Sequence, residues 1–169
     1  MLTCYFSATI QNSKKMKRLL TLVLSLGVLS ISAQTLTAKW TSDATLSIPE
    51  SVLLDAKNNV LYVSSIGGSP EVKDGDGFIS QLTTDGKIKN LKWATGLDAP
   101  KGMGLFNNNL YVADITKVVT INIATGKITQ SVEIEGAQFL NDITVDKNGN
   151  VYVSDSNTGK IHLVKGNKA

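Results

Sequence analysis

Short apolar runs, separated by polar turns rich in Asn, Asp and Gly, cover the chain from residue 47 onward. Within these runs apolar residues alternate with polar ones or stand side by side, and β-branched and aromatic residues are frequent. Such runs between turn residues are typical of β-strands. After residue 40 no window keeps apolar residues at helical spacing over several turns, so the pattern predicts an all-β domain.

One unit of two apolar runs around a polar turn recurs three times. It reads FLNDITVDKNGNVYVSDS at 139–156, and related units occupy 48–66 and 99–115. The three copies align on Tyr62, Tyr111 and Tyr152, each preceded by an Asn-rich turn and followed by a small or acidic residue. Because Asn and Gly accept the backbone conformations of tight turns, each unit is predicted to be a β-hairpin.

A second turn follows each hairpin, and its glycine recurs as Gly86, Gly126 and Gly166, 40 residues apart. A period of about 40 residues with four short strands is typical of a β-propeller blade, whose sheet buries its faces against neighbouring blades. The sequence therefore predicts a β-propeller of four-stranded blades. About three blades are present, at 47–97, 98–136 and 137–169, and the last has no sequence for a fourth strand.

The predicted strands follow from the apolar runs. They are 51–55, 60–65, 78–83 and 88–94 in the first blade, 102–106, 110–114, 118–123 and 128–134 in the second, and 143–146, 151–155 and 160–165 in the third. Between the second and third strands the first blade carries an extra loop, GGSPEVKDGDG at 67–77, which the other two do not have. Open sheet edges at the ends of such a partial ring favour self-association.

The first 33 residues follow a different pattern. A second methionine, Met16, is followed by Lys17 and Arg18 and by a 13-residue apolar core at 19–31. A membrane-spanning helix needs about 20 apolar residues, so 1–33 is predicted to be an extension and a secretory signal peptide with translation from Met16. We expect a periplasmic or secreted protein with no stable membrane span after cleavage; an uncleaved signal anchor is the alternative.

Residues 34–46 form a polar lead-in that contains Trp40, and this segment is predicted to be an edge strand or a tether that packs on the first blade. The single cysteine, Cys4, precedes it, so the domain can form no internal disulfide. The formal net charge of +3 is small and its lysines are scattered, which argues against a nucleic-acid partner. The only histidine, His162, alternates with apolar neighbours and fits a structural role better than that of a base.

Polar residues stand directly before the innermost strand of each blade. Aligning the repeats places Glu50, Lys101 and Asn141 at equivalent positions, so their side chains are expected to converge near the propeller axis. Carboxylate and amide oxygens suit Ca²⁺ or a similar divalent cation. The alternative is that these residues cap strand ends by bonding to neighbouring backbone groups.

The segments PESVLLDAKNNVLYVSSI and LNDITVDKNGNVYVSDS resemble the inner hairpins of the gluconolactonase family, which includes regucalcin (senescence marker protein) and has six blades. The resemblance covers most of 47–168 and suggests the N-terminal half of such a protein. It implies a divalent metal, Ca²⁺ or another, bound by Glu50 and Asn141. If the chain is a metal-dependent hydrolase, we expect Asp142 to be the catalytic base or a supporting residue and Lys101 to contact the substrate.

Two functions follow from these observations. The first is an exported, metal-dependent hydrolase of a lactone or sugar-derived ester, complete only in a longer protein, so that this chain by itself is an inactive fragment. The second is a non-catalytic propeller, since NHL-type propellers share the hairpin pattern. It would bind a protein or carbohydrate through its loops, including the one at 67–77.

Overall fold

The computed structural model describes residues 35–165. The chain divides into two compact units, Met1–Ala38 and Lys39–Ala169, and all eleven strands lie in the second. The predicted signal peptide with Met16, and Cys4 before it, lie outside the described residues. No helix among the described residues is long and apolar enough to cross a membrane.

Residues 39–165 form three antiparallel sheets, and residues 35–165 contain no helix, so the all-β prediction is confirmed. Every predicted strand is present, with ends shifted by a few residues at most. The first sheet contains β1 (Pro49–Asp55), β2 (Val60–Ser65), β3 (Gly77–Thr83) and β4 (Ile88–Leu97); the second contains β5 (Pro100–Phe106), β6 (Asn109–Asp114), β7 (Lys117–Asn122) and β8 (Ile128–Glu133); the third contains β9 (Leu140–Val145), β10 (Val151–Asp155) and β11 (Lys160–Val164).

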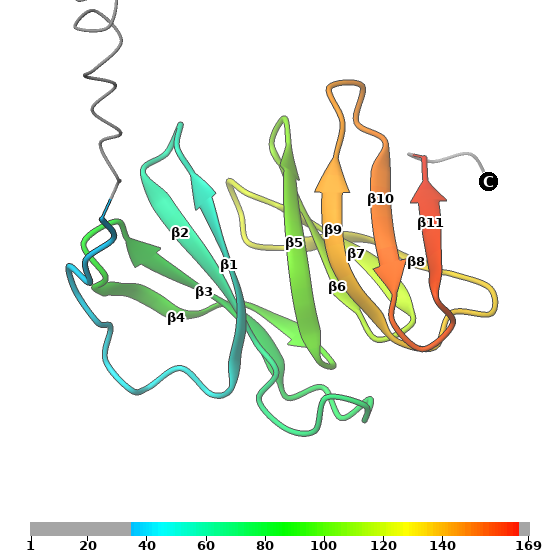
Figure 1. The fold of residues 1–169 in the computed structure, drawn as a ribbon, viewed down its shortest axis with the longest axis horizontal. Helices are drawn as coiled ribbons and strands as arrows, with labels where there is room; N and C mark the ends of the chain where they lie inside the picture. Colours follow the sequence, from blue (N-terminus) through cyan, green and yellow to red (C-terminus); the bar gives the residue numbers. More distant parts are fainter. Residues whose placement is uncertain (1–34, 166–169) are drawn as a thin grey trace, which may run out of the picture. The chain divides into compact units, whose positions relative to one another are not determined.

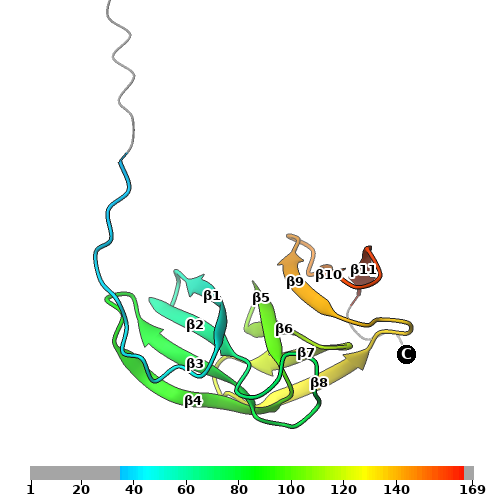
Figure 2. The same ribbon diagram turned by 60° about the horizontal axis from the view of Figure 1, so that its bottom comes forward.

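Each sheet has its strands in sequence order, so its first strand forms one edge. These first strands are neighbours, because β1 contacts β5 and β5 contacts β9 (Figure 1). In the turned view the same three strands lie together on one side, while β4 and β8 lie on the other (Figure 2). This is the arrangement of propeller blades around an axis, with β1, β5 and β9 innermost.

Apolar side chains that point to alternate faces of the strands fill the spaces between the sheets. Tyr62 and Ile79 of the first sheet pack against Leu110 and Val112 of the second, and all four are buried. A second core joins Ala113 and Val118 of the second sheet to Val151 and Val153 of the third. Burying one such aliphatic side chain stabilises the fold by about 1.5–3 kcal/mol, so the contacts between blades hold the sheets in place.

The lead-in packs on the first sheet and forms no strand at 39–43, so it is the predicted tether and not the predicted edge strand. The Trp40 ring covers Gly86, in the turn between β3 and β4, so closely that a Cβ there would overlap it. Gly86 has a φ of 87°, a conformation that glycine adopts without strain. One repeat later, the Trp93 ring lies within 3.2 Å of the position that a Cβ would take at Gly126.

Candidate functional site at the inner strand ends

The predicted site residues lie at the beginnings of the innermost strands. Glu50, Lys101 and Asn141 are each the second residue of their strand, in β1, β5 and β9 respectively. The three strands run in the same direction, so these positions share one end of the sheets, at the bottom of Figure 1. The alignment of the repeats therefore predicted their equivalence correctly.

A close approach between two inner strands brings Asp142 into this group. At Gly102 of β5 a Cβ would lie 2.6 Å from both the Asn141 carbonyl oxygen and the Asp142 Cα. Real Cβ atoms do not come this close to backbone, so only glycine lets β9 approach β5 here. The Asp142 N–H is fixed further by a 3.0 Å hydrogen bond to Ser154 Oγ.

The charge of Asp142 acts on Glu50. Partial burial raises the pKa of Glu50, and the negative charge of Asp142 raises it further, while Lys101 opposes both effects. Like charges repel each other, so a cation bound near both carboxylates would be favoured. Both side chains remain exposed and accessible to a ligand.

Asn141 adds an amide oxygen to the carboxylates. Its side chain is half-buried, and its Nδ2 donates a 3.3 Å hydrogen bond to Ser156 Oγ. Since this bond uses the nitrogen, Oδ1 is the atom that can act as a metal ligand.

Lys101 is held inside the protein, with only 2% of its surface exposed. Its Nζ donates hydrogen bonds to the carbonyl oxygens of Pro70 (3.1 Å) and Ala99 (3.0 Å), and lies 4.3 Å from the centre of the Phe139 ring. Burial lowers the pKa of Lys101, and nearby carboxylates, Asp114 and Glu50 among them, oppose this. Lys101 therefore connects the loop at 67–77 to the second blade and places positive charge beside Glu50.

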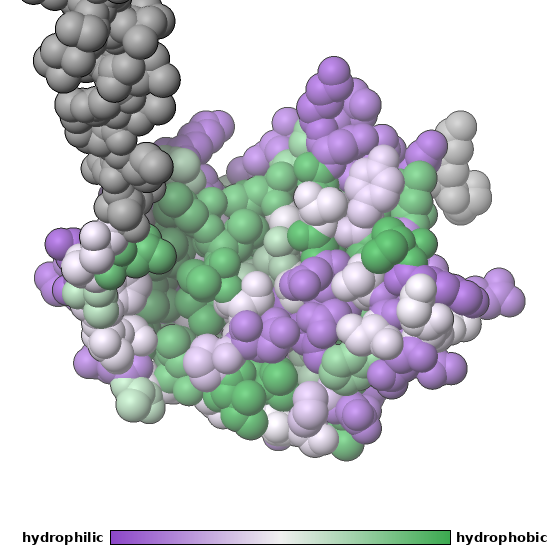
Figure 3. All heavy atoms as spheres, viewed as in Figure 1, coloured by the Kyte–Doolittle hydropathy of each residue, from purple (hydrophilic) through white to green (hydrophobic). Residues whose placement is uncertain are grey.

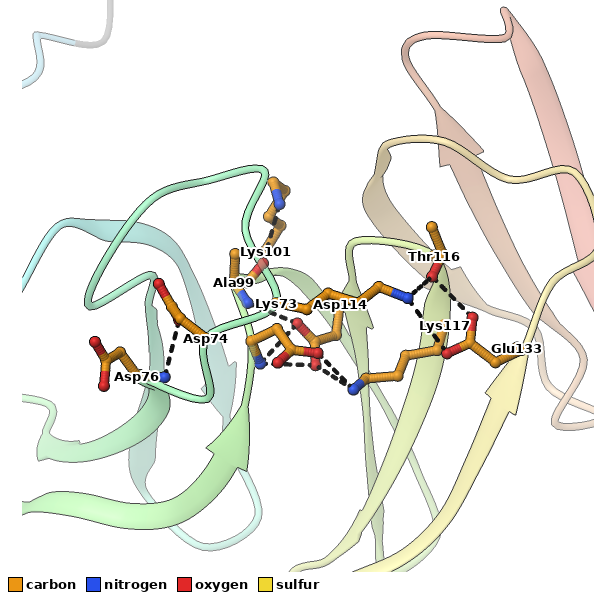
Figure 4. A network of polar contacts seen from close by, with 10 residues as sticks. Lys73, Asp74, Asp76, Ala99, Lys101, Asp114, Thr116, Lys117 and Glu133 are labelled. Atoms are coloured by element: carbon orange, nitrogen blue, oxygen red, sulfur yellow. Dashed lines mark hydrogen bonds and ion pairs between the residues drawn. The ribbon is translucent and has the colours of Figure 1, made fainter.

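A second lysine anchors the same loop. Lys73 Nζ donates a 2.7 Å hydrogen bond to Thr116 Oγ1 and lies 3.6 Å from Glu133 Oε1, while the Thr116 hydroxyl donates to Glu133 Oε2 (Figure 4). These groups are exposed, so the pairs add little stability. They place Lys73 over the turn between β6 and β7 and the end of β8, while the buried Lys101 is the stronger anchor of the loop.

Two buried aspartates support the site. From the sequence they were predicted only as acidic residues that follow Tyr111 and Tyr152 in the repeat. Asp114, at the end of β6, is fully buried and accepts hydrogen bonds from the backbone N–H groups of Asp98 and Ala99. Lys117 Nζ lies 2.7 Å from Asp98 Oδ2 and 3.5 Å from Asp114 Oδ2. Asp114 thereby fixes the backbone just before Pro100 and Lys101.

Asp155 repeats this arrangement in the third blade. Its carboxylate accepts hydrogen bonds from the N–H groups of Gln138 (2.9 Å) and Phe139 (3.1 Å), just before β9. Burial alone would raise the pKa of Asp155, but these donors hold it well below its usual range. His162 Nε2 lies 3.6 Å from Asp155 Oδ2. The recurring Tyr-Val-x-Asp at 111–114 and 152–155 was the sequence signal for both aspartates.

The site has the kinds of oxygen ligand that cations bind, but only a small number of them. Glu50 and Asp142 offer carboxylates and Asn141 an amide oxygen, which are ligands that Ca²⁺ accepts. Within residues 35–165 no three His, Cys, Asp or Glu side chains gather closely enough to hold a metal. Since Ca²⁺ takes 6–8 oxygens, water or groups from elsewhere would have to complete the shell.

No family model matches the sequence, and no curated protein matches it. Among solved structures, a chain in the crystal structure of a nidogen/laminin complex is 20% identical over 72% of this chain and 44% of that one, with a TM-score of 0.57. A gluconolactonase from Xanthomonas campestris is 16% identical over 70% of this chain and 46% of that one, with a TM-score of 0.49. The chain thus spans less than half the length of either, and the first likeness shows a propeller-like fold.

Proposed function

We propose that the inner strand ends form part of the cation site of an exported hydrolase that opens lactones or related sugar-derived esters. The observation that carries the proposal is that Glu50 and Asn141 occupy equivalent positions at the beginnings of inner strands, with Asp142 next to Asn141. The resemblance of PESVLLD and LNDITV to gluconolactonase hairpins supports the same reading. Further blades or a second chain would supply the remaining ligands.

The electrostatics favour a bound cation at this place. Burial and the charge of Asp142 both raise the pKa of Glu50, so keeping Glu50 ionised costs free energy that a divalent cation offsets. A bound metal supplies polarisation of the ester carbonyl and a more acidic water. Asp142 would orient a water at the site or accept a proton from it, and the buried Lys101 ammonium would offset part of the negative charge of Glu50.

Calcium titration of the purified chain, followed by calorimetry, tests the cation site directly. Glu50→Gln keeps the shape and removes the charge, so we expect affinity for Ca²⁺ to fall by about tenfold or more. The matched control is Glu135→Gln, which removes the same charge from an exposed position after β8. A Glu50→Gln variant that binds as well as the control, or the absence of divalent-cation binding in every assembly of the chain, refutes the site.

Hydrolysis is measured separately, with a sugar lactone and a range of divalent cations. Turnover that requires both the metal and Glu50 supports the hydrolase. If calcium binds through Glu50 but no lactone or ester is opened in any assembly of the chain, the cation site stands and the hydrolase assignment is wrong.

A second function follows from the anchored loop. Since Lys101 and Lys73 fix the loop at 67–77 to the second blade, it forms a preordered surface, on which Val72 is half exposed. A propeller that binds a protein or carbohydrate would use such a surface. In that case Val72→Ser would weaken carbohydrate or protein binding and leave calcium binding intact.

A further inference from the structure

We propose that residues 39–48 complete the third blade of a second copy of this chain, so that two copies exchange this segment and close one ring. Among the described residues the first two sheets have four strands and the third has three. The outer edge of β11 therefore presents backbone N–H and C=O groups to which another strand can pair.

The segment at 39–48 resembles the fourth strand of a blade in sequence. Lys39-Trp40 is followed by Leu46 and by Pro49, which begins β1; Lys92-Trp93 is followed by Leu97 and by Pro100, which begins β5. The Lys92-Trp93 pair lies within β4, the fourth strand of the first blade. The lead-in thus has the position and the residue pattern of a fourth strand from a preceding blade.

The structure shows the same equivalence in three dimensions. Trp93 covers Gly126 in the blade that follows it, and Trp40 covers Gly86, the equivalent glycine of the first blade. Each tryptophan therefore packs on the turn between the third and fourth strands of the next blade. Trp40 therefore occupies the same position on the first blade that Trp93 occupies on the second.

Trp40 is more exposed than its counterpart Trp93. The rings of Trp93 and Tyr62, in the same sheet, have centroids 5.0 Å apart, whereas Trp40 is 47% exposed. The residue equivalent to Tyr62 in the third blade is Tyr152, which is half-buried. Pairing of residues 39–43 with β11 would give Trp40 the corresponding contact with Tyr152.

The two outer faces of the half ring are apolar where this exchange would join them. On the third sheet Ile161 and Leu163 are 69% and 47% exposed. His162, which lies between them, pairs with Val153 of the core between the second and third sheets. Ile161 and Leu163 therefore face away from the second sheet. On β1 Val52 and Leu54 are 63% and 52% exposed, on the side opposite to Leu53, which packs toward the second sheet. Figure 3 shows apolar residues gathered over the first sheet and a smaller group near β11.

A second copy is the occupant that this geometry favours. The lead-in packs on the first sheet, and the second sheet lies between the first and the third, so the segment lies far from β11 of its own chain. Exchange between two copies gives six four-stranded blades and joins both pairs of apolar faces. It also brings a second Glu50, Asn141 and Asp142 to the same axis, which doubles the oxygen donors there.

Engineered cysteines test the exchange through its register. In the first blade Ala94, the residue after Trp93, pairs with Ile79. The equivalent residues are Thr41 and Ile161, so we expect these two to face each other across chains. In the full-length chain with Cys4→Ser, co-expressed Thr41→Cys and Ile161→Cys chains should form a disulfide-linked dimer, while either variant alone should not. A double variant that cross-links only within one chain, or no cross-link at all, overturns the exchange.

Light scattering on the unmodified chain provides a test that needs no new bond. We expect the mass of two chains, and a shift toward one chain for Trp40→Ala or Ile161→Lys. Val72→Ala, which shortens an exposed side chain outside both faces, is the control and should leave the mass unchanged. A single-chain mass for the unmodified protein, or a dimer indifferent to both substitutions, overturns the proposal.

Discussion

The beginnings of the second and third blades are built alike, and the beginning of the first is built differently. At the position after Tyr-Val-x, Asp114 and Asp155 are buried and accept backbone N–H groups from the segment before the innermost strand. Ser65 stands there in the first blade, and its hydroxyl is buried without a hydrogen-bond partner among the described residues. A hydroxyl is too short to bridge to the backbone that a carboxylate reaches.

The first blade holds its entry segment through the extra loop. Ser47 Oγ donates to the Gly67 carbonyl (3.2 Å), and the N–H groups of Ile66 and Gly67 donate to the carbonyls of Ile48 and Ser47. Ile48 has a φ of 53°, which is unusual for a β-branched residue. The segment before Glu50 is thus held by Ile66, after β2, and by Gly67, the first residue of the loop, whereas the segments before Lys101 and Asn141 are held by buried aspartates.

The largest effect is expected from Asp114→Ala. It leaves the buried N–H groups of Asp98 and Ala99 without an acceptor, and each unpaired donor costs about 1–3 kcal/mol. We expect the free energy of unfolding to fall by about 2–4 kcal/mol, measured by urea denaturation. A loss no larger than that of the exposed control Asp43→Ala would show that the aspartate does not hold the blade.

A smaller, pH-dependent effect is expected at Asp155. Its pKa is lower in the folded protein than in the unfolded chain, so its contribution is present above the ordinary aspartate pKa of about 3.9 and disappears as the pH falls through the lower, folded value. Thermal unfolding between pH 7 and pH 2 should show this acid loss. In Asp155→Asn the loss should be shallower; an unchanged slope contradicts the assignment.

The smallest effect is expected from Ser65→Ala. Since the Ser65 hydroxyl makes no hydrogen bond in the described part of the chain, removing it should change the unfolding free energy by less than about 0.5 kcal/mol, or stabilise the protein slightly. Denaturation under the conditions used for Asp114→Ala gives the direct comparison. A loss as large as that of Asp114→Ala would mean that Ser65 holds its blade after all.

The strands could be predicted from the sequence because the repeat shows them three times. Turn residues and β-branched runs are local signals, and the 40-residue period joined them into blades. The equivalence of Glu50, Lys101 and Asn141 followed from the same alignment. What a period cannot give is the contact between residues of different repeats.

The surroundings of Lys101 illustrate this limit. Two of its three partners are Pro70, in a loop without an equivalent in the other blades, and Phe139, from the next blade. Neither contact follows from residue spacing, because both depend on how adjacent blades pack. The role of Asp114 was similarly hidden, since its donors are backbone groups, which every residue has. The metal and substrate assignments stay predictions.

The chain contains two tryptophans, and the structure places both on equivalent glycine turns, with Trp93 half-buried and Trp40 47% exposed. Indole fluorescence shifts to shorter wavelengths when water is removed from the ring. Trp93 therefore acts as an internal reference with a constant surrounding, and Trp40 reports whether another sheet covers the lead-in. The emission spectrum of the native chain, recorded over a dilution series, therefore reports whether Trp40 on the first blade is covered by another sheet or exposed to water.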